Sequence, residues 1–162
     1  MHDEPEPTTT HRGIDRRGCI GYRASVSADL ETAMRTVLAR GPAVRFAALF
    51  GSRARGTARP DSDIDVAWLP ADANLPLGAE LELQAELTRV AGHEVDLVRL
   101  DHASSLLRFE VARDGVLLFG TPSAFTGFRV EAIAEWLDYE PAFRAASERF
   151  RRRLAAGASV KP

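Results

Sequence analysis

The stretch "FGSRARGTARPDSDIDVAWL", residues 50–69, decides the fold of this chain. It follows the apolar run "AVRFAALF" at residues 43–50, which is bounded by proline and glycine and predicts a buried strand. It ends in "DIDVAWLP", residues 63–70, whose alternating polar and apolar residues predict a second strand. Between the two strands the sequence predicts a turn that is rich in glycine, arginine and aspartate.

Asp63 and Asp65 lie two residues apart on the second predicted strand. Their side chains therefore project from the same face, where two carboxylates repel each other unless a cation lies between them. Mg²⁺ prefers oxygen ligands and commonly binds one or two carboxylates together with substrate phosphates. The pair predicts a magnesium site, and the alternative is a polar strand end with solvated aspartates. Asp61 is predicted to be only a polar loop residue.

Gly51 and Ser52 come directly after the first predicted strand, and the following "RARG" has helical character. A junction of strand, turn and helix offers free N–H groups and a helix dipole to an anion. Glycine lets the backbone approach a phosphate closely, and the serine hydroxyl can donate to it. Arg53 and Arg55 would add charge-assisted bonds to a triphosphate, unless they are simply a solvated pair.

Asp96 supplies a third carboxylate, in the middle of the predicted strand "HEVDLVRL" at residues 93–100. A charge inside an apolar strand is costly to bury unless it is paired or bound to a metal. Beside two other carboxylates, Asp96 is predicted to be a third metal ligand. The structural alternative is a salt bridge to an arginine such as Arg99 or Arg45.

The remaining patterns predict helices separated by short strands. Apolar periodicity and start and stop signals predict further elements: helices at 27–40, 77–91, 102–115 and from Pro122 to about 156, interrupted near Pro141, and a strand at 116–120. The order predicts an α/β (α+β) fold, a small mixed sheet flanked by helices. We expect a disordered or loosely attached leader at 1–26, a core at 27–120 and a C-terminal helical extension at 121–162.

Composition narrows the class of protein. The chain has 162 residues, a formal net charge of -2 and one cysteine, Cys19, which excludes an intramolecular disulfide and a cysteine-based zinc site. The negative charge argues against general nucleic-acid binding, and no apolar run reaches the length of a membrane span. The acidic, proline-rich beginning differs from a signal peptide. We expect a cytoplasmic protein without direct nucleic-acid or membrane binding.

The motifs "GSRARGTARPDSDIDV" and, later in the chain, "VDLV" resemble those of the nucleotidyltransferase superfamily typified by DNA polymerase beta. More narrowly, they resemble the minimal nucleotidyltransferases, the MNT or MntA antitoxins, which are usually encoded beside a HEPN-domain ribonuclease toxin. The resemblance covers about residues 27–120 and implies a polymerase-beta-like nucleotidyltransferase fold. The segment "RFEVARDGVLLF" at 108–119 is similar to the closing helix and strand of the family.

The resemblance implies a role for each motif residue. Gly51 and Ser52 would hold the β- and γ-phosphates of ATP, and Asp63 and Asp65 would bind two Mg²⁺ ions. Asp96 would share the catalytic metal and help to deprotonate the attacking hydroxyl. In the family that hydroxyl belongs to a tyrosine of the HEPN toxin, which receives AMP and loses its ribonuclease activity.

Other functions remain open at this point. Nucleotide transfer to a small molecule such as an aminoglycoside normally needs a sizeable extra domain, whereas only residues 121–162 follow the core. Transfer to tRNA is disfavoured by the negative charge and by the lack of an RNA-binding region. A non-catalytic module would neutralise its partner by occlusion alone. The basic segment "RFRRRL" at 149–154 is a solvated helical face, a docking surface for an acidic partner or an RNA contact.

Overall fold

The computed structural model describes residues 26–59 and 61–158, so nearly all of the predicted leader lies outside the described residues. Every predicted helix and strand within this range is present, with small shifts at the ends. The elements in chain order are α1 (Ala28–Arg40), β1 (Val44–Leu49), α2 (Gly51–Arg55), β2 (Ile64–Pro70), α3 (Leu77–Ala91), β3 (Val95–Arg99), α4 (Ser105–Asp114), β4 (Val116–Gly120) and α5 (Pro122–Ala158).

The four strands form one mixed sheet in the order β3-β2-β1-β4. Strand β1 runs antiparallel to both of its neighbours, whereas β2 and β3 are parallel and are joined across one face by α3. In the parallel pair Asp65 lies opposite Asp96. The predicted small mixed sheet flanked by helices is confirmed.

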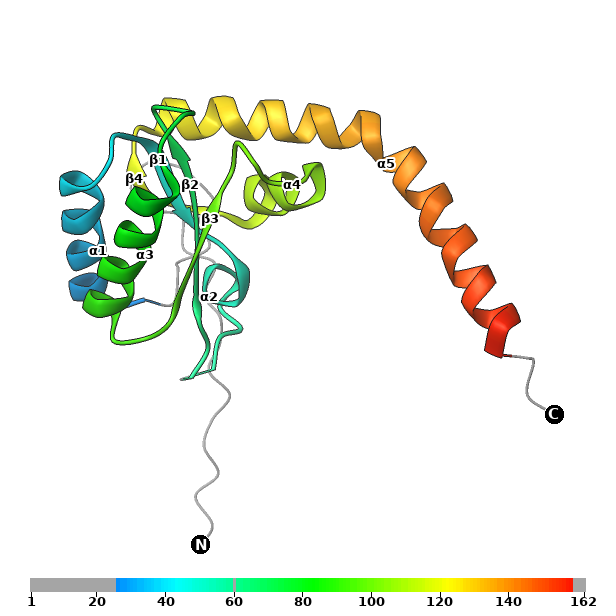
Figure 1. Cartoon of the computed structure of the whole chain (residues 1–162), viewed down its shortest axis with the longest axis horizontal. Coiled ribbons are helices and arrows are strands. Elements are labelled where there is room, and N and C mark those ends of the chain that lie inside the picture. The colour runs from blue at the N-terminus through cyan, green and yellow to red at the C-terminus, as the bar shows by residue number, and fades with distance from the viewer. Residues whose placement is uncertain (1–25, 60, 159–162) are drawn as a thin grey trace, which may run out of the picture.

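Helices cover both faces of the sheet, with α1 and α3 on one face and α4 and the first part of α5 on the other (Figure 1). The alternation along β2 follows this arrangement, since Val66 and Trp68 join the core under α1 and α3. Ala67, between them, joins the core under α4 and α5. Residues two apart share a face, so Asp65 points to the side of α4 and α5.

Local signals in the sequence explain where the helices begin and end. The hydroxyl of Ser27 accepts a hydrogen bond from the N–H of Leu30, and that of Ser104 accepts one from Leu107. These N-caps satisfy backbone donors that have no partner within the helix. Helix α3 ends at Gly92, whose positive φ of 64° suits a glycine C-cap.

Helix α5 differs from the prediction in one respect, because it continues through Pro141 over 37 residues. Proline removes one hydrogen bond of the helix and commonly bends it. Figure 1 shows α5 bending in its orange part, the part of the helix that contains Pro141. Within residues 26–59 and 61–158, no helix has the length and apolar character required to cross a membrane.

Replacing Phe46 by alanine is expected to lower the free energy of unfolding by about 3–5 kcal/mol, because it removes a fully buried ring. That ring contacts Phe125 and Phe128 on α5, with centroids 5.3 and 5.1 Å apart. Urea denaturation would measure the loss. Phe150→Ala, at a side chain that is 63% exposed, is the control and should change stability by less than about 0.5 kcal/mol. Equal losses would contradict this assignment of the core.

Candidate active site

The turn after β1 packs directly against the first residues of β2. The N–H of Phe50 donates to the carbonyl oxygen of Asp65 at 3.0 Å, and the chain then turns at Gly51 with φ +67°. A Cβ added to Gly51 would lie 2.0 Å from Oδ2 of Asp65. Glycine is therefore required for its backbone conformation and for the space that Asp65 occupies. The predicted phosphate-binding turn and the predicted metal ligand are in contact.

The three predicted metal ligands meet at one end of β2 and β3. Asp65 is half-buried opposite Asp96, while Asp96 and Asp63 are exposed. Burial raises the pKa of Asp65, as do the charges of Asp96 and Asp63, and Arg55 opposes this rise. In the described part of the chain none of the three carboxylates forms an ion pair. The structure thus places three carboxylates near one another, with Arg55 offsetting only part of their repulsion.

The structure corrects the reasoning about Asp96. Strand β3 lies at the edge of the sheet, and Asp96 is exposed, so the expectation of a costly buried charge was wrong. The alternative, a salt bridge to Arg99, is not found either. Arg99 instead binds Asp101 at 2.9 Å and donates to the carbonyl oxygen of Leu75 at 3.1 Å. Among the described residues Arg45 forms no ion pair with Asp96. What singles out Asp96 is its position opposite Asp65.

Arg53 is buried, and its contacts are with the backbone. Its Nε donates to the carbonyl oxygens of Ser62 and Asp63, each at 3.2 Å, and its Nη2 also donates to Ser62. These bonds fasten the loop that leads into β2 and fix the backbone of Asp63. A positioning role is what these contacts favour, and binding of the triphosphate by Arg53 remains a prediction.

Arg55 is half-exposed and lies near the carboxylates, where its charge opposes the rise in the pKa of Asp65. Its Nη1 is 3.5 Å from Oδ2 of Asp114 at the end of α4. Arg113 binds the same carboxylate at 2.7 Å, and the pKa of Asp114 is lowered by Arg113 first and then by Arg55. Asp114 thus holds Arg55 beside the site. The sequence pattern did not reveal this role, since an Asp-Gly pair usually only ends a helix.

The donor set suits Mg²⁺, which prefers carboxylate oxygens and tolerates bound water and phosphate as further ligands. Asp65 and Asp96 come from adjacent strands, and Asp63 precedes the first of them. Across residues 26–59 and 61–158, however, no three acidic, histidine or cysteine side chains converge on one point. In this arrangement the three carboxylates do not form a complete metal site by themselves. Binding of a metal by Asp63, Asp65 and Asp96 remains a prediction, in which phosphate and water would supply the further ligands.

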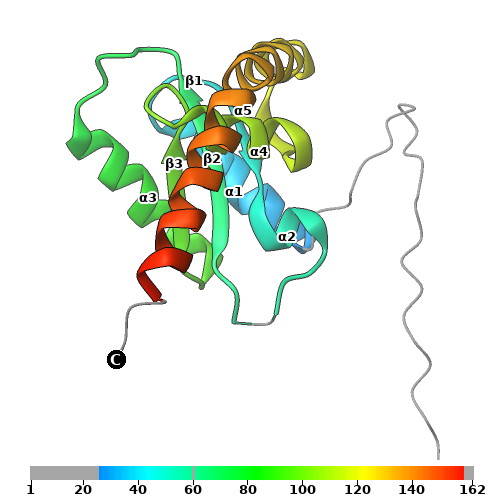
Figure 2. The same cartoon turned by 90° about the vertical axis from the view of Figure 1, so that its right-hand side faces the viewer.

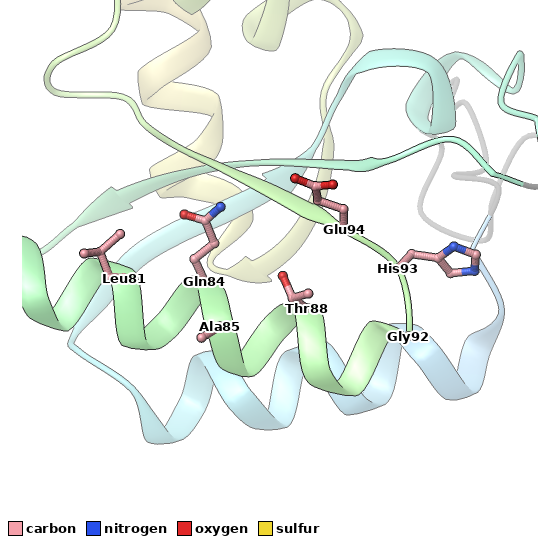
Figure 3. A pocket seen from close by; sticks show the side chains of 7 residues that line it. All are labelled: Leu81, Gln84, Ala85, Thr88, Gly92, His93 and Glu94. Carbon is pink, nitrogen blue, oxygen red and sulfur yellow. The ribbon is translucent and has the colours of Figure 1, made fainter.

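A hollow lies near this end of β3, on the side of α3. Figure 3 shows it between α3 and the start of β3. Its volume is about 620 Å³. Its lining includes Gln84, which donates to the carbonyl oxygen of Val95, and Thr88, whose hydroxyl accepts from the N–H of Val95. These bonds anchor α3 to β3. None of the three carboxylates lines the hollow.

Comparison with known proteins identifies the family of this chain. Residues 33–123 match the family described as polymerase beta, nucleotidyltransferase. The match spans more than half of the chain, which therefore belongs to the polymerase beta nucleotidyltransferase family. Within this family it is similar to a protein adenylyltransferase MntA from Shewanella oneidensis, with 39% identity over 93 residues. That match covers 57% of this chain and 66% of the relative.

Two solved structures show the same fold. One is a toxin-antitoxin with AMP-PNP, whose matching chain has a TM-score of 0.68 and 32% identity, covering 75% of this chain and 98% of that one. The other is a tri-AMPylated Shewanella oneidensis HEPN toxin in complex with an MNT antitoxin, with a TM-score of 0.64, 29% identity and coverage of 75% and 96%. The resemblance to the minimal nucleotidyltransferases and the predicted fold are confirmed.

Gly51→Ala is expected to destabilise the protein more than Gly56→Ala does. Both glycines have positive φ, which costs an alanine about 1–2 kcal/mol. Only at Gly51 does the added Cβ also collide with Asp65, because nothing lies within 4 Å at Gly56. Urea denaturation of both variants separates the two effects. Gly78→Ala in α3, where the new Cβ also meets nothing, is the control without backbone strain. Equal losses at Gly51 and Gly56 would show that the contact with Asp65 is unimportant.

Asp65→Asn is expected to stabilise the metal-free protein at neutral pH. The folded pKa of Asp65 is raised, so its contribution to stability is present below the unfolded pKa and is lost as the pH rises through the folded pKa. Asparagine removes the unfavourable ionised form. The gain over the wild type should be largest near pH 7 and shrink toward pH 3.8.

Urea unfolding in the presence of a chelator, at a series of pH values, measures this difference. Asp61→Asn, at an exposed loop residue of the same stretch, is the control for the loss of one charge. A gain at Asp65 that does not change with pH would count against the electrostatic cluster.

Proposed function

We propose that this chain transfers AMP from ATP to a tyrosine hydroxyl of a HEPN-domain ribonuclease toxin, and so acts as the antitoxin of that pair. The toxin would be encoded by a neighbouring gene, and the reaction would take place in the cytoplasm. The observation that carries the proposal is the turn at Gly51, packed on Asp65, with Asp96 opposite Asp65 in the sheet. Membership of a nucleotidyltransferase family supports the reaction class.

The acceptor is proposed from the relatives. The similar Shewanella oneidensis protein is named protein adenylyltransferase MntA, and an antitoxin of the same fold has been solved with a tri-AMPylated HEPN toxin. The exposure of Asp63 and Asp96 agrees with a macromolecular acceptor. A tyrosine on the surface of a folded protein can reach carboxylates that lie in the open, and a small molecule would need a concave site with several walls.

Gly51 and Ser52 are proposed to bind the β- and γ-phosphates through the turn after β1. Asp63, Asp65 and Asp96 would hold two Mg²⁺ ions, which when bound would stabilise the charge of the phosphates and of the leaving pyrophosphate. The acceptor oxygen bonds to the α-phosphorus as the bond from that phosphorus to pyrophosphate breaks. Asp96, exposed to the incoming protein, assists removal of the hydroxyl proton.

The two arginines of the turn are proposed to have different duties. Arg53 fixes the backbone of Asp63 through the carbonyl bonds described above. Arg55 is held by Asp114 and remains half-exposed, so it can add positive charge beside a triphosphate. Arg55 would then offset part of the negative charge of both the bound ATP and the carboxylates.

Asp96→Asn is expected to reduce AMP transfer on the order of 10³-fold, because the loss of a metal-binding carboxylate removes several kcal/mol of transition-state stabilisation. The purified protein would be incubated with ATP, Mg²⁺ and the HEPN protein, and the added mass of AMP followed by mass spectrometry. Asp61→Asn should keep wild-type turnover. The fold of both variants, checked by circular dichroism, should be unchanged.

The same assay separates catalysis from occlusion. If Asp63→Ala/Asp65→Ala neutralises the toxin as well as the wild type does and no AMP is added, the protein acts by binding alone. Full turnover in Asp96→Asn would show that this carboxylate has no part in the reaction.

A further inference from the structure

Helix α5 has two parts with different surroundings. In the first part an apolar stripe is buried against the body of the protein: Phe125, Phe128, Ala132 and Trp136. There α5 contacts α4, β1 and β4. Beyond Trp136 the helix leaves the body, as its orange to red part in Figure 1 shows. We call residues 137–158 the arm.

The apolar stripe does not stop where the body ends. It continues at helical spacing through four side chains of the arm, which are 37–63% exposed: Tyr139, Phe143, Phe150 and Leu154. The two parts join in an aromatic cluster, where Trp136 stacks on Phe109 of α4 at 5.2 Å and touches Phe143 at 5.6 Å. The bare stripe is thus a direct extension of the face that α5 already uses for packing.

The charge of the arm indicates what kind of surface can cover this stripe. The arm contains five arginines and three acidic residues, Asp138, Glu140 and Glu148, and Glu140 pairs with Arg144 at 2.6 Å. The other four arginines lie together at residues 149–153, beside the exposed end of the stripe. Two copies of the arm would bring their arginines together and repel each other. A favourable partner therefore has an apolar face rimmed by carboxylates, which covers the stripe and pairs with the arginines.

The arm also lies on the side of the molecule that carries the candidate site. Helix α5 packs on the face of the sheet to which Asp65 and Asp96 point. In Figure 2, viewed from the right-hand side of Figure 1, the red end of the arm stands in front of the sheet. A protein bound to the arm would therefore lie on the same side of the molecule as the carboxylates.

We propose that the arm is the docking surface for the protein that receives AMP, through an apolar face of that protein rimmed by acidic residues. The identity of the partner rests on the function proposed above, whereas the docking surface rests on the stripe and charge of the arm. The arm lowers the concentration of acceptor needed and takes no part in the chemical step.

The test compares variants of the full-length protein with the wild type. Phe150→Glu/Leu154→Glu places charge on the bare stripe, and Val130→Glu changes a side chain of α5 that is 65% exposed and lies off the stripe. Binding of the HEPN protein is measured by calorimetry. The double variant should bind at least about 30-fold more weakly, as expected for loss of central apolar contacts, and Val130→Glu should bind like the wild type.

Kinetics provide the second readout. The double variant should show a raised KM for the HEPN protein with kcat retained, which is the signature of lost binding without lost chemistry. Arg152→Glu/Arg153→Glu should also weaken binding, and the remaining affinity should depend less on salt.

The outcomes separate the two proposals. Wild-type affinity in both double variants would overturn the docking surface while leaving AMP transfer intact. Arm-dependent binding without any AMP transfer would support the docking surface and overturn the proposed function. Failure of the wild type to bind the HEPN protein would overturn docking of this partner. A dimer of the wild type that dissociates on Phe150→Glu/Leu154→Glu, seen by sedimentation without partner, would show instead that the arm joins two copies.

Discussion

The close packing of Gly51 on the side chain of Asp65 is the constraint on which the arrangement of the site depends. It joins the end of β1 to the start of β2 so closely that no side chain fits between them. The backbone bond from Phe50 to Asp65 fixes the same junction. These two contacts tie the turn at Gly51 to the acidic start of β2.

A second constraint is electrostatic. Three carboxylates lie near one another, and Arg55 is the nearby positive charge in the described part of the chain. Burial and the charges of Asp96 and Asp63 raise the pKa of Asp65, and Arg55 offsets part of this rise. A protein selected only for stability would neutralise such a cluster. Its persistence is typical of sites in which a ligand supplies the missing positive charge. Arg53 fixes the loop that leads into β2, and Asp114 holds Arg55 beside the carboxylates.

The sequence predicted the fold well because its signals were local. Periodicity and the start and stop signals located the elements, and the spacing of Asp63 and Asp65 predicted that they share one face. Features that depend on the tertiary structure could not be predicted. Asp96 is exposed because β3 lies at the edge of the sheet, and the sequence of β3 does not show whether the strand is central or at the edge. The side chain of Arg53 donates to the carbonyl oxygens of Ser62 and Asp63, which come near it only in the folded loop. Its positioning role therefore could not be predicted from the sequence.

The parallel pairing of β2 and β3 has a consequence for how the protein matures. Asp65 and Asp96 become neighbours only after α3 has crossed the sheet and β3 has paired with β2. Parallel pairs of this kind are non-local contacts that require closure of a long loop before they contribute stability. The turn at Gly51 needs only the strands on either side of it, whereas the acidic cluster also needs α3 and β3 in place. The cluster is therefore a property of the complete sheet.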